Sequence, residues 1–384
     1  MSARRIVLAS AVLGLAVVAA LPSYADPGDD NGNGKDRGHH YAYGHDKHHP
    51  GQADADPCVG DPSQVLNLSY SVKGQTAQAL YALPAGKPRG IVVFDHGYGH
   101  TMYSWSAHLA RTASTLGVIA IAPDYRGQVD SPATKPGGLP SSRGWQVAEG
   151  AEDSIAAVQM FDRLCGHNGI NVVYGVSMGG NTSGLVVASK PQDAKGKPLF
   201  DYWVAVEPAV NVTETYQGAR ALAGVNEFAA HAQADIEKEM GGPFESKPAV
   251  YADRTVVNRT QDIAASGIKG VVIAHGIVDG LVTHDESRQL QVLLRAQQIP
   301  VDMAAFLTHS EHSEAGTTLD GYAPVPHDSP FAGHASETST TQDVGVAGFA
   351  ALAKLYSGQA FWCGESFYDG ATGEHLYQQD NVVC

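Results

Sequence analysis

The fold is decided by the stretch Ile170-Asn-Val-Val-Tyr-Gly-Val-Ser-Met-Gly-Gly180. Its apolar run leads directly into Gly175-Val-Ser177-Met-Gly179, a pattern typical of a tight strand-to-helix turn that lifts a serine hydroxyl clear of the sheet. We call this turn the elbow. A side chain at either glycine would collide with the neighbouring strand or helix. The alternative is a chance match in a chain with 43 glycines. The apolar strand before the pattern and the small residues after it favour Ser177 as a nucleophile.

Residues 1–25 have the pattern of a secretory signal peptide. Arg4 and Arg5 give a positive start, the apolar run 6–21 is too short to span a bilayer comfortably, and Ser23-Tyr24-Ala25 has a small residue at each outer position. This pattern favours cleavage after Ala25 over an uncleaved anchor. We therefore expect a secreted protein with no stable membrane anchor, exported by the Sec route, with twin-Arg export left open by the arginine pair.

Residues 26–57 are rich in Gly, Asp, Asn, Lys and His and contain almost no aliphatic side chains. Such a segment buries too little apolar surface to offset its ordering entropy, so we expect a disordered linker. Its histidines are His39, His40, His45, His48 and His49. They could bind Zn, Ni or Cu loosely, but no rigid frame holds a ligand geometry, and we favour a solvated linker without a metal site.

Composition excludes some classes of protein. About 330 residues follow the linker, enough for one large domain over 58–384. The net charge of −15 becomes more negative when the two arginines of the signal peptide are removed. A chain this acidic is not a general nucleic-acid binder, and we expect no nucleic-acid partner.

The chain has four cysteines, namely Cys58, Cys165, Cys363 and Cys384. An even number in an exported protein implies two disulfides, for which three pairings are possible. We favour Cys58–Cys165, which ties the N-terminus to the body of the domain, and Cys363–Cys384, which closes a C-terminal tail over 358–384. No Cys-x-x-Cys pair suggests structural zinc.

Strands and helices alternate along the domain. Strands are expected at 65–72, 77–83, 90–95, 117–122, before the elbow, and at 202–206, 269–274 and 301–307. Helices are expected at 106–116, 145–165, after the elbow, at 226–240 and 283–298, and up to about 356. This order predicts an α/β protein whose sheet is mostly parallel and doubly wound after an antiparallel start. Residues 208–266 break the alternation, either as a cap or as ordinary surface packing.

With the elbow, this order resembles the α/β-hydrolase superfamily over about 65–356, and among its members secreted bacterial serine esterases and lipases. Asp95-His96-Gly97-Tyr98-Gly99 looks like the family's H-G-x-G loop, and residues 122–127 are also typical of the family. The resemblance implies an oxyanion hole made by the N–H groups of Tyr98 and Met178. Losing one such donor typically costs about 3 kcal/mol of transition-state stabilisation.

The resemblance also implies an acid in a loop between a late strand and a helix. Asp279, in His275-Gly-Ile-Val-Asp279, has that position. A carboxylate there fixes the tautomer of a histidine and stabilises its imidazolium form. Asp285 and Asp302 are poorer candidates, because they lie on an expected helix and in an expected strand.

Four histidines follow the last expected strand of the alternating series, namely His309, His312, His327 and His334. The family has a Gly-His pair shortly before its final helix, which His334 fits. His312 fits a short loop directly after the strand and is our second choice. In either case the residues between them, 313–333, are an insertion.

We therefore expect a secreted serine hydrolase that cleaves carboxylic esters through an acyl-enzyme, in the chain order Ser177, Asp279, His334. The expected substrate is a small-molecule or lipid-like ester, and no metal or organic cofactor is required. One alternative is an exported peptidase or amidase on the same triad. Another is a non-catalytic hydrolase-fold protein with a metal-binding His tract. The lack of a long N-terminal propeller and of a pocket motif for a peptide terminus favours the esterase.

Overall fold

The structure is a computed structural model of the chain. It describes residues 56–128, 144–277, 279–306, 334, 335, 337, 342–359, 361–369 and 374–383. The expected signal peptide and residues 26–55 of the expected linker lie outside these ranges, as does the second-choice base, His312.

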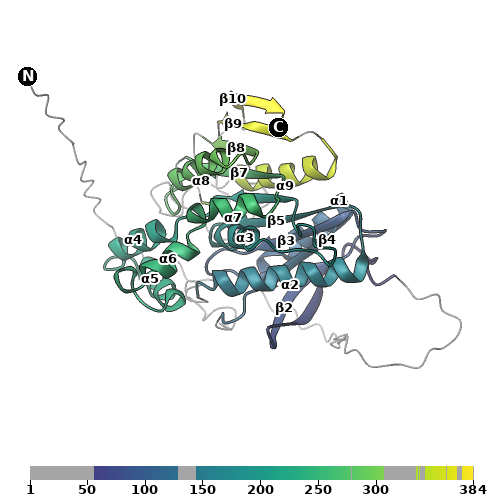
Figure 1. The fold of residues 1–384 in the computed structure, drawn as a ribbon, viewed down its shortest axis with the longest axis horizontal. Helices are drawn as coiled ribbons and strands as arrows, with labels where there is room; N and C mark the ends of the chain where they lie inside the picture. The colour runs from purple at the N-terminus through teal and green to yellow at the C-terminus, as the bar shows by residue number, and fades with distance from the viewer. Residues whose placement is uncertain are drawn as a thin grey trace, which may run out of the picture.

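The described strands form one mixed sheet in the order β1-β2-β4-β3-β5-β6-β7-β8-β9-β10 (Figure 1). Neighbours from β4 to β9 are parallel, whereas the pairs β1–β2, β2–β4 and β9–β10 are antiparallel. The strands are β1 (Leu66–Val72), β2 (Gln75–Ala82), β3 (Gly90–Asp95), β4 (Ile119–Asp124), β5 (Ile170–Val176), β6 (Tyr202–Val206), β7 (Gly270–Gly276), β8 (Val301–Phe306), β9 (Trp362–Tyr368) and β10 (His375–Val383).

Helices cover both faces of this sheet. They are α1 (Ser106–Leu116), α2 (Val147–Cys165), α3 (Met178–Ala188), α4 (Val212–Leu222), α5 (Glu227–Met240), α6 (Pro248–Arg254), α7 (Thr260–Ala265), α8 (His284–Ala296) and α9 (Asp343–Tyr356). Because successive side chains of a strand point to opposite faces, Ile91 and Val93 of β3 join the core under α2, α3 and α8, while Val92 and Phe94 join the core under α1 and α9. Apolar residues on both faces explain the unbroken hydrophobic runs of the central strands.

The expected α/β architecture, with its mostly parallel, doubly wound sheet, is confirmed, and the ends of most expected elements are shifted by one or two residues. One difference is the tail over 358–384, where β9 and β10 extend the sheet beyond β8. Cys58 is bonded to Cys165, as expected. Cys363 is also disulfide-bonded, and its expected partner, Cys384, lies outside the described residues.

The segment 208–266 contains α4, α5, α6 and α7, and the first three gather at one end of the molecule (Figure 1). Tyr98, in the loop after β3, contacts this segment, because its hydroxyl donates to Asp235 Oδ2 of α5 over 2.6 Å and its ring meets Phe228 edge-on.

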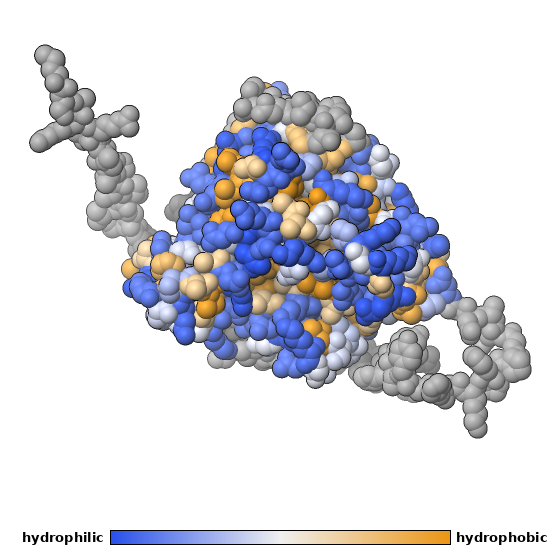
Figure 2. Space-filling model, in the orientation of Figure 1, coloured by the Kyte–Doolittle hydropathy of each residue, from blue (hydrophilic) through white to orange (hydrophobic). Residues whose placement is uncertain are grey.

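The face shown in Figure 2 is mostly hydrophilic, with scattered hydrophobic residues. No helix within the described ranges is both long and apolar enough to cross a bilayer.

Candidate active site

Ser177 stands at the turn between β5 and α3, with a positive φ of 56° and ψ of −122°. A non-glycine residue in this conformation costs about 1–3 kcal/mol and persists only where its surroundings hold it. Here the Ser177 N–H donates to Val206 O over 3.0 Å, and its carbonyl accepts from the N–H groups of Gly180 and Ala209 at 2.8 and 3.0 Å. Backbone bonds to adjacent elements therefore fix the elbow.

Glycine is needed on both sides of the serine. A Cβ at Gly175 would collide with the carbonyl of Gly179, and a Cβ at Gly179 would collide with the carbonyls of Asp95 and His96. The turn therefore packs directly against the loop that follows β3. Within that loop, a Cβ at Gly97 would lie 3.4 Å from Ser177 Cβ, so the backbone beside Tyr98 passes the candidate nucleophile.

The two expected oxyanion donors lie on the two sides of this contact. Met178 is the first residue of α3, so its N–H has no partner within the helix. Tyr98 follows Gly97 in the loop that approaches Ser177, and its side chain is held by α5 through Asp235. Donors at a helix start and in a neighbouring loop can converge on one oxygen, which is the arrangement that an oxyanion needs.

Asp279, the expected acid, is buried in the loop after β7. Its Oδ1 accepts from the N–H groups of Leu281 and Val282 at 2.8 and 3.1 Å, and its Oδ2 lies 2.8 Å from His334 Nδ1 and 3.4 Å from His275 Nε2. Burial alone would raise the pKa of Asp279. The positive charge of His334 and the hydrogen bonds from both imidazoles outweigh it and hold that pKa below its ordinary value.

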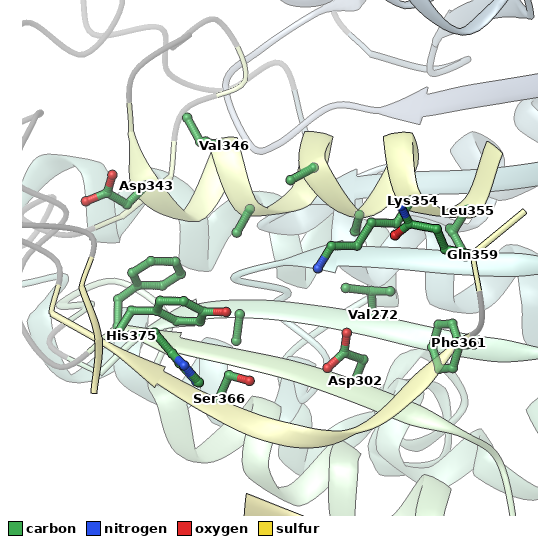
Figure 3. Close-up of a pocket in the computed structure, with 16 residues that line it drawn as sticks. Val272, Asp302, Asp343, Val346, Lys354, Leu355, Gln359, Phe361, Ser366 and His375 are labelled. Atoms are coloured by element: carbon green, nitrogen blue, oxygen red, sulfur yellow. The ribbon is translucent and has the colours of Figure 1, made fainter. Parts of the chain in front are cut away.

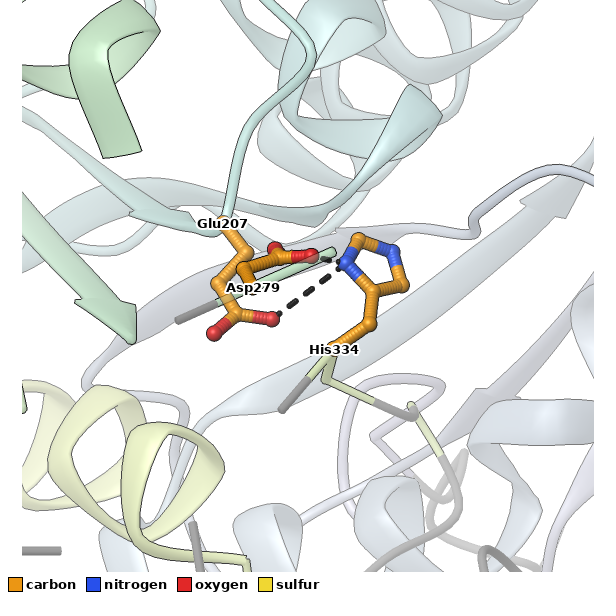
Figure 4. Close-up of side chains that lie close together, drawn as sticks. All are labelled: Glu207, Asp279 and His334. Atoms are coloured by element: carbon orange, nitrogen blue, oxygen red, sulfur yellow. Dashed lines mark hydrogen bonds and ion pairs between the residues drawn. The ribbon is translucent and has the colours of Figure 1, made fainter. Parts of the chain in front are cut away.

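His334, the preferred base, meets Asp279 (Figure 4). When Nδ1–H donates to Asp279, the lone pair is left on Nε2, which faces away from the carboxylates in Figure 4. Burial lowers the pKa of His334, but the charge and hydrogen bond of Asp279, with the charge of Glu337, raise it above 6.5 overall. The other histidines considered for the base, His309, His312 and His327, lie outside the described residues.

Glu207 is a third member of this cluster that the sequence analysis did not single out. It directly follows β6, is buried, and has a φ of 44°. Its Oε1 accepts from Gly276 N–H over 3.0 Å, its Oε2 accepts from Ala335 N–H, and Oε2 lies 3.4 Å from His334 Nδ1. Burial, followed by the negative charge of Asp279, raises the pKa of Glu207 well above its ordinary range. Glu207 therefore holds its proton more tightly than an ordinary glutamate does.

Donor atoms of Glu207, Asp279 and His334 lie within 4.8 Å of one another, close enough to surround a metal ion. A metal would need the lone pair of His334 Nδ1, whereas the 2.8 Å contact with Asp279 has the geometry of Nδ1–H donating to a carboxylate. Both oxygens of Glu207 already accept from backbone N–H groups, those of Gly276 and Ala335. Hydrogen bonds therefore account for the cluster.

Glu337 also escaped the sequence analysis. Its carboxylate is buried, accepts from Gly97 N–H, and lies 3.1 Å from His100 Nδ1. It thus joins the segment that carries His334 to the loop that carries Tyr98. A glutamate three residues after a candidate base was the available signal, but its role depends on contacts between distant segments.

A cavity of about 550 Å³ lies elsewhere, between α9 and the strands β7, β8 and β9. Asp302 of β8 and Lys354 of α9 reach into it from opposite sides (Figure 3). Burial raises the pKa of Asp302 to about 6, against the opposing charges of Lys354 and Arg295. None of Ser177, Asp279 and His334 lines this cavity. Asp285, the other poorer candidate for the acid, lies in the first turn of α8.

Several solved structures align with this chain at low sequence identity. An esterase of Pyrobaculum calidifontis aligns with a TM-score of 0.52 at 17% identity, over 77% of this chain and 85% of its own. A thermostable esterase of Pseudomonas putida aligns with a TM-score of 0.51 at 15% identity, over 77% of this chain and 82% of its own. A puromycin-hydrolysing peptidase of Mycobacterium tuberculosis reaches 0.49 at 16% identity, over 77% of this chain and 40% of its own.

At identities this low, a match shows a similarity of fold alone. A search of curated proteins finds no match. A family model described as "Alpha/beta hydrolase family" matches residues 92–338, which include the loop after β3, the elbow, Asp279 and His334. Since this match spans well over half of the chain, the protein belongs to the alpha/beta hydrolase family.

Proposed function

We propose that the protein is a serine hydrolase that cleaves carboxylic esters, with Ser177 as nucleophile, His334 as base and Asp279 as acid. One observation carries the proposal: the hydrogen bond of 2.8 Å between His334 Nδ1 and Asp279 Oδ2, in the fold that places Ser177 on a strained turn. The contact selects the tautomer that a base needs, with the lone pair on Nε2.

In the proposed reaction, Ser177 Oγ attacks the carbonyl carbon of the ester as its proton passes to His334 Nε2. The N–H groups of Tyr98 and Met178 bind the developing oxyanion. His334 then gives the proton to the leaving alcohol, which leaves an acyl group on Ser177. Water attacks this acyl group with His334 again as base, which releases the acid and restores the serine.

Asp279 serves the proposed reaction by its charge. It is ionised across the neutral pH range because its pKa is lowered, and it stabilises the imidazolium that forms in each half of the reaction. The raised pKa of Glu207 favours its neutral form, which adds no second negative charge beside the imidazolium. His334 can then return its proton to the leaving group.

Ester substrates are favoured over peptides because both solved structures reported above 0.5 in TM-score are named esterases. The test compares hydrolysis of p-nitrophenyl acetate and butyrate with that of peptide anilides, with Ser177→Ala as the control. We expect ester hydrolysis that is lost in the variant. Serine-dependent cleavage of the anilides with no ester cleavage would instead make the protein a peptidase or amidase. Ester cleavage unchanged in Ser177→Ala would reject the proposed site.

Secretion is part of the proposal and rests on the sequence of residues 1–25. The expected mature chain begins at Asp26. N-terminal sequencing of the protein from culture medium tests this expectation. A chain that keeps Met1 and stays with the cells would contradict it.

A further inference from the structure

The segment that carries His334 is described at residues 334, 335 and 337, outside the named helices and strands. Yet a general base must stay within about 3 Å of the proton that it takes. Side chains from other segments hold it. Gln342 Nε2 donates to the backbone carbonyl of His334 over 2.8 Å, and Asp279 accepts from the imidazole ring of His334. Two buried carboxyl groups, those of Glu207 and Glu337, add contacts that the triad itself does not require.

We propose that Glu207 and Glu337 are positioning residues that hold His334 between the acid loop, which follows β7 and carries Asp279, and the oxyanion loop, which follows β3 and carries Tyr98. Glu207 acts through Ala335 N–H, and Glu337 acts through Gly97 N–H. The inference rests on the proposed serine hydrolase. It adds two residues that act through His334 and Tyr98 without touching the substrate.

Glu207 joins three segments at one point. Its own backbone directly follows β6, its Oε1 accepts from Gly276 N–H at the end of β7, and its Oε2 accepts from Ala335 N–H next to His334. Burying a carboxyl group is unfavourable unless its hydrogen bonds are made, and here both oxygens have partners. Losing the group would leave two buried N–H donors unsatisfied and free the segment beside the base.

Glu337 links the two halves of the site. One oxygen accepts from Gly97 N–H, directly before Tyr98, and the other lies 3.1 Å from His100 Nδ1. A shift of the histidine segment would therefore pull on the oxyanion loop. The ionised carboxylate also raises the pKa of His334, so its charge has an effect that packing alone would not produce.

The ionisable groups around this pair can be named from the contacts of the described residues. Asp279, His275 and Glu207 face His334 from the ends of β7 and β6. On the other side, His100 faces Glu337 from the loop after β3, and Tyr125 and Tyr174 lie close enough for Glu337 to raise their pKa values. Among the described residues, the basic side chains in contact with Glu337 and Asp279 are thus histidines.

The test pairs a conservative and a disruptive variant at each position, assayed on p-nitrophenyl butyrate. Glu337→Gln keeps an acceptor for Gly97 N–H but removes the charge. We expect kcat at the pH optimum within about fivefold of wild type, with the acid limb of kcat/KM moved to lower pH. Glu337→Leu removes the acceptor, and we expect kcat to fall about 10- to 100-fold with KM within about threefold, the scale of a misplaced catalytic group.

Glu207→Leu is expected to lose kcat on the same scale. Glu207→Gln should fall between wild type and Glu207→Leu, because its single carbonyl can satisfy only one of the two N–H donors. The matched control is Glu365→Gln, which removes a buried carboxylate of β9 that pairs with Arg288. This control should leave the pH profile of kcat/KM unchanged, and thermal unfolding of every variant shows whether it is folded.

The outcomes separate the two proposals. If wild type cleaves the ester and Ser177→Ala does not, yet Glu337→Gln keeps the wild-type acid limb and the folded leucine variants keep kcat, the positioning roles are wrong and the hydrolase stands. If the leucine variants do not fold, the acid limb of Glu337→Gln decides alone, and an unmoved limb overturns the role of Glu337. A Glu207→Gln variant that is folded and as active as wild type overturns the role of Glu207. A wild-type protein that does not cleave the ester would reject the proposed function.

Discussion

Ser177 and His334 reach the candidate site by different routes. Ser177 is fixed by backbone hydrogen bonds within the elbow and to the adjacent end of β6. His334 is fixed by side chains from other parts of the chain, among them Asp279 and Glu207. The nucleophile is thus built by local sequence, and the base by buried contacts between distant segments. The difference predicts that the elbow tolerates distant substitutions that the base does not.

The largest expected effect comes from the nucleophile. Ser177→Ala should lower kcat for p-nitrophenyl butyrate by about 10⁴-fold or more, because the attacking oxygen is lost. The temperature of unfolding should stay close to that of wild type. Ser189→Ala is the control, because among the described residues the Ser189 hydroxyl donates only to Leu185 O at the end of α3. A Ser177→Ala variant that keeps a tenth of wild-type kcat would show that Ser177 is not the nucleophile.

His334→Ala should lose several decades of kcat as well, since the base and its link to Asp279 disappear together. His312→Ala should keep wild-type kcat. Both enzymes are compared on the same short-chain ester. If His312→Ala loses several decades while His334→Ala keeps more than about a tenth of kcat, the base is His312, and the insertion 313–333 follows the triad.

The pH dependence of kcat/KM offers a finer test of His334 as the base. Because the pKa of His334 is raised, the imidazole should gain its proton, and kcat/KM should fall, as the pH drops through a midpoint above 6.5. Below the midpoint, kcat/KM should fall about tenfold per pH unit. The profile is measured with an ester whose hydrolysis is followed at each pH. A midpoint below 6.5 would mean that Asp279 and Glu337 do not act on the base as described.

A cross-link outside the candidate site should affect stability more than chemistry. The Cys58–Cys165 disulfide joins the start of the domain to the end of α2. Cys58→Ser with Cys165→Ser should lower the free energy of unfolding by about 2–4 kcal/mol and leave kcat within about twofold. Denaturant unfolding and ester hydrolysis at 25 °C measure the two effects. A large loss of kcat in the folded variant would show that α2 supports the site directly.

The smallest expected effect concerns a carboxyl group outside the site. A pKa of about 6 means that folding favours neutral Asp302, so the ionised form reduces stability as the pH rises from about 4 to 6. Asp302→Asn should therefore stabilise the protein by about 1–2 kcal/mol at pH 8, have little effect at pH 4, and leave kcat unchanged. Unfolding at both pH values checks this. A large fall in kcat would instead connect the cavity to the reaction.

The elbow was predictable because its requirements are local. A strand, two glycines and a serine conformation belong to consecutive residues, and Gly175 and Gly179 have the close neighbours that their spacing predicts. Asp279 was selected by its position after a strand, and the structure brings it to His334, the preferred histidine.

Other features could not be predicted from the sequence for physical reasons. Glu207 and Glu337 look like ordinary surface acids in the sequence, and only tertiary packing buries them against Ala335 N–H and Gly97 N–H. The strand β10 was missed because His375-Leu-Tyr-Gln-Gln-Asp-Asn is mostly polar and lacks the apolar alternation of a buried strand. That alternation is needed only where one face of a strand is buried against the core, and His375 and Leu376 at the start of β10 are exposed.

Reaction with a fluorophosphonate probe tests Ser177 and His334 together, since the probe needs both an activated serine and its base. After labelling, peptide mapping by mass spectrometry locates the modified residue, and the rate of labelling is compared between wild type and His334→Ala. We expect one label per chain, at Ser177, with labelling slowed by several decades in His334→Ala. A label on another residue, no label, or a wild-type rate in the folded His334→Ala variant would contradict it.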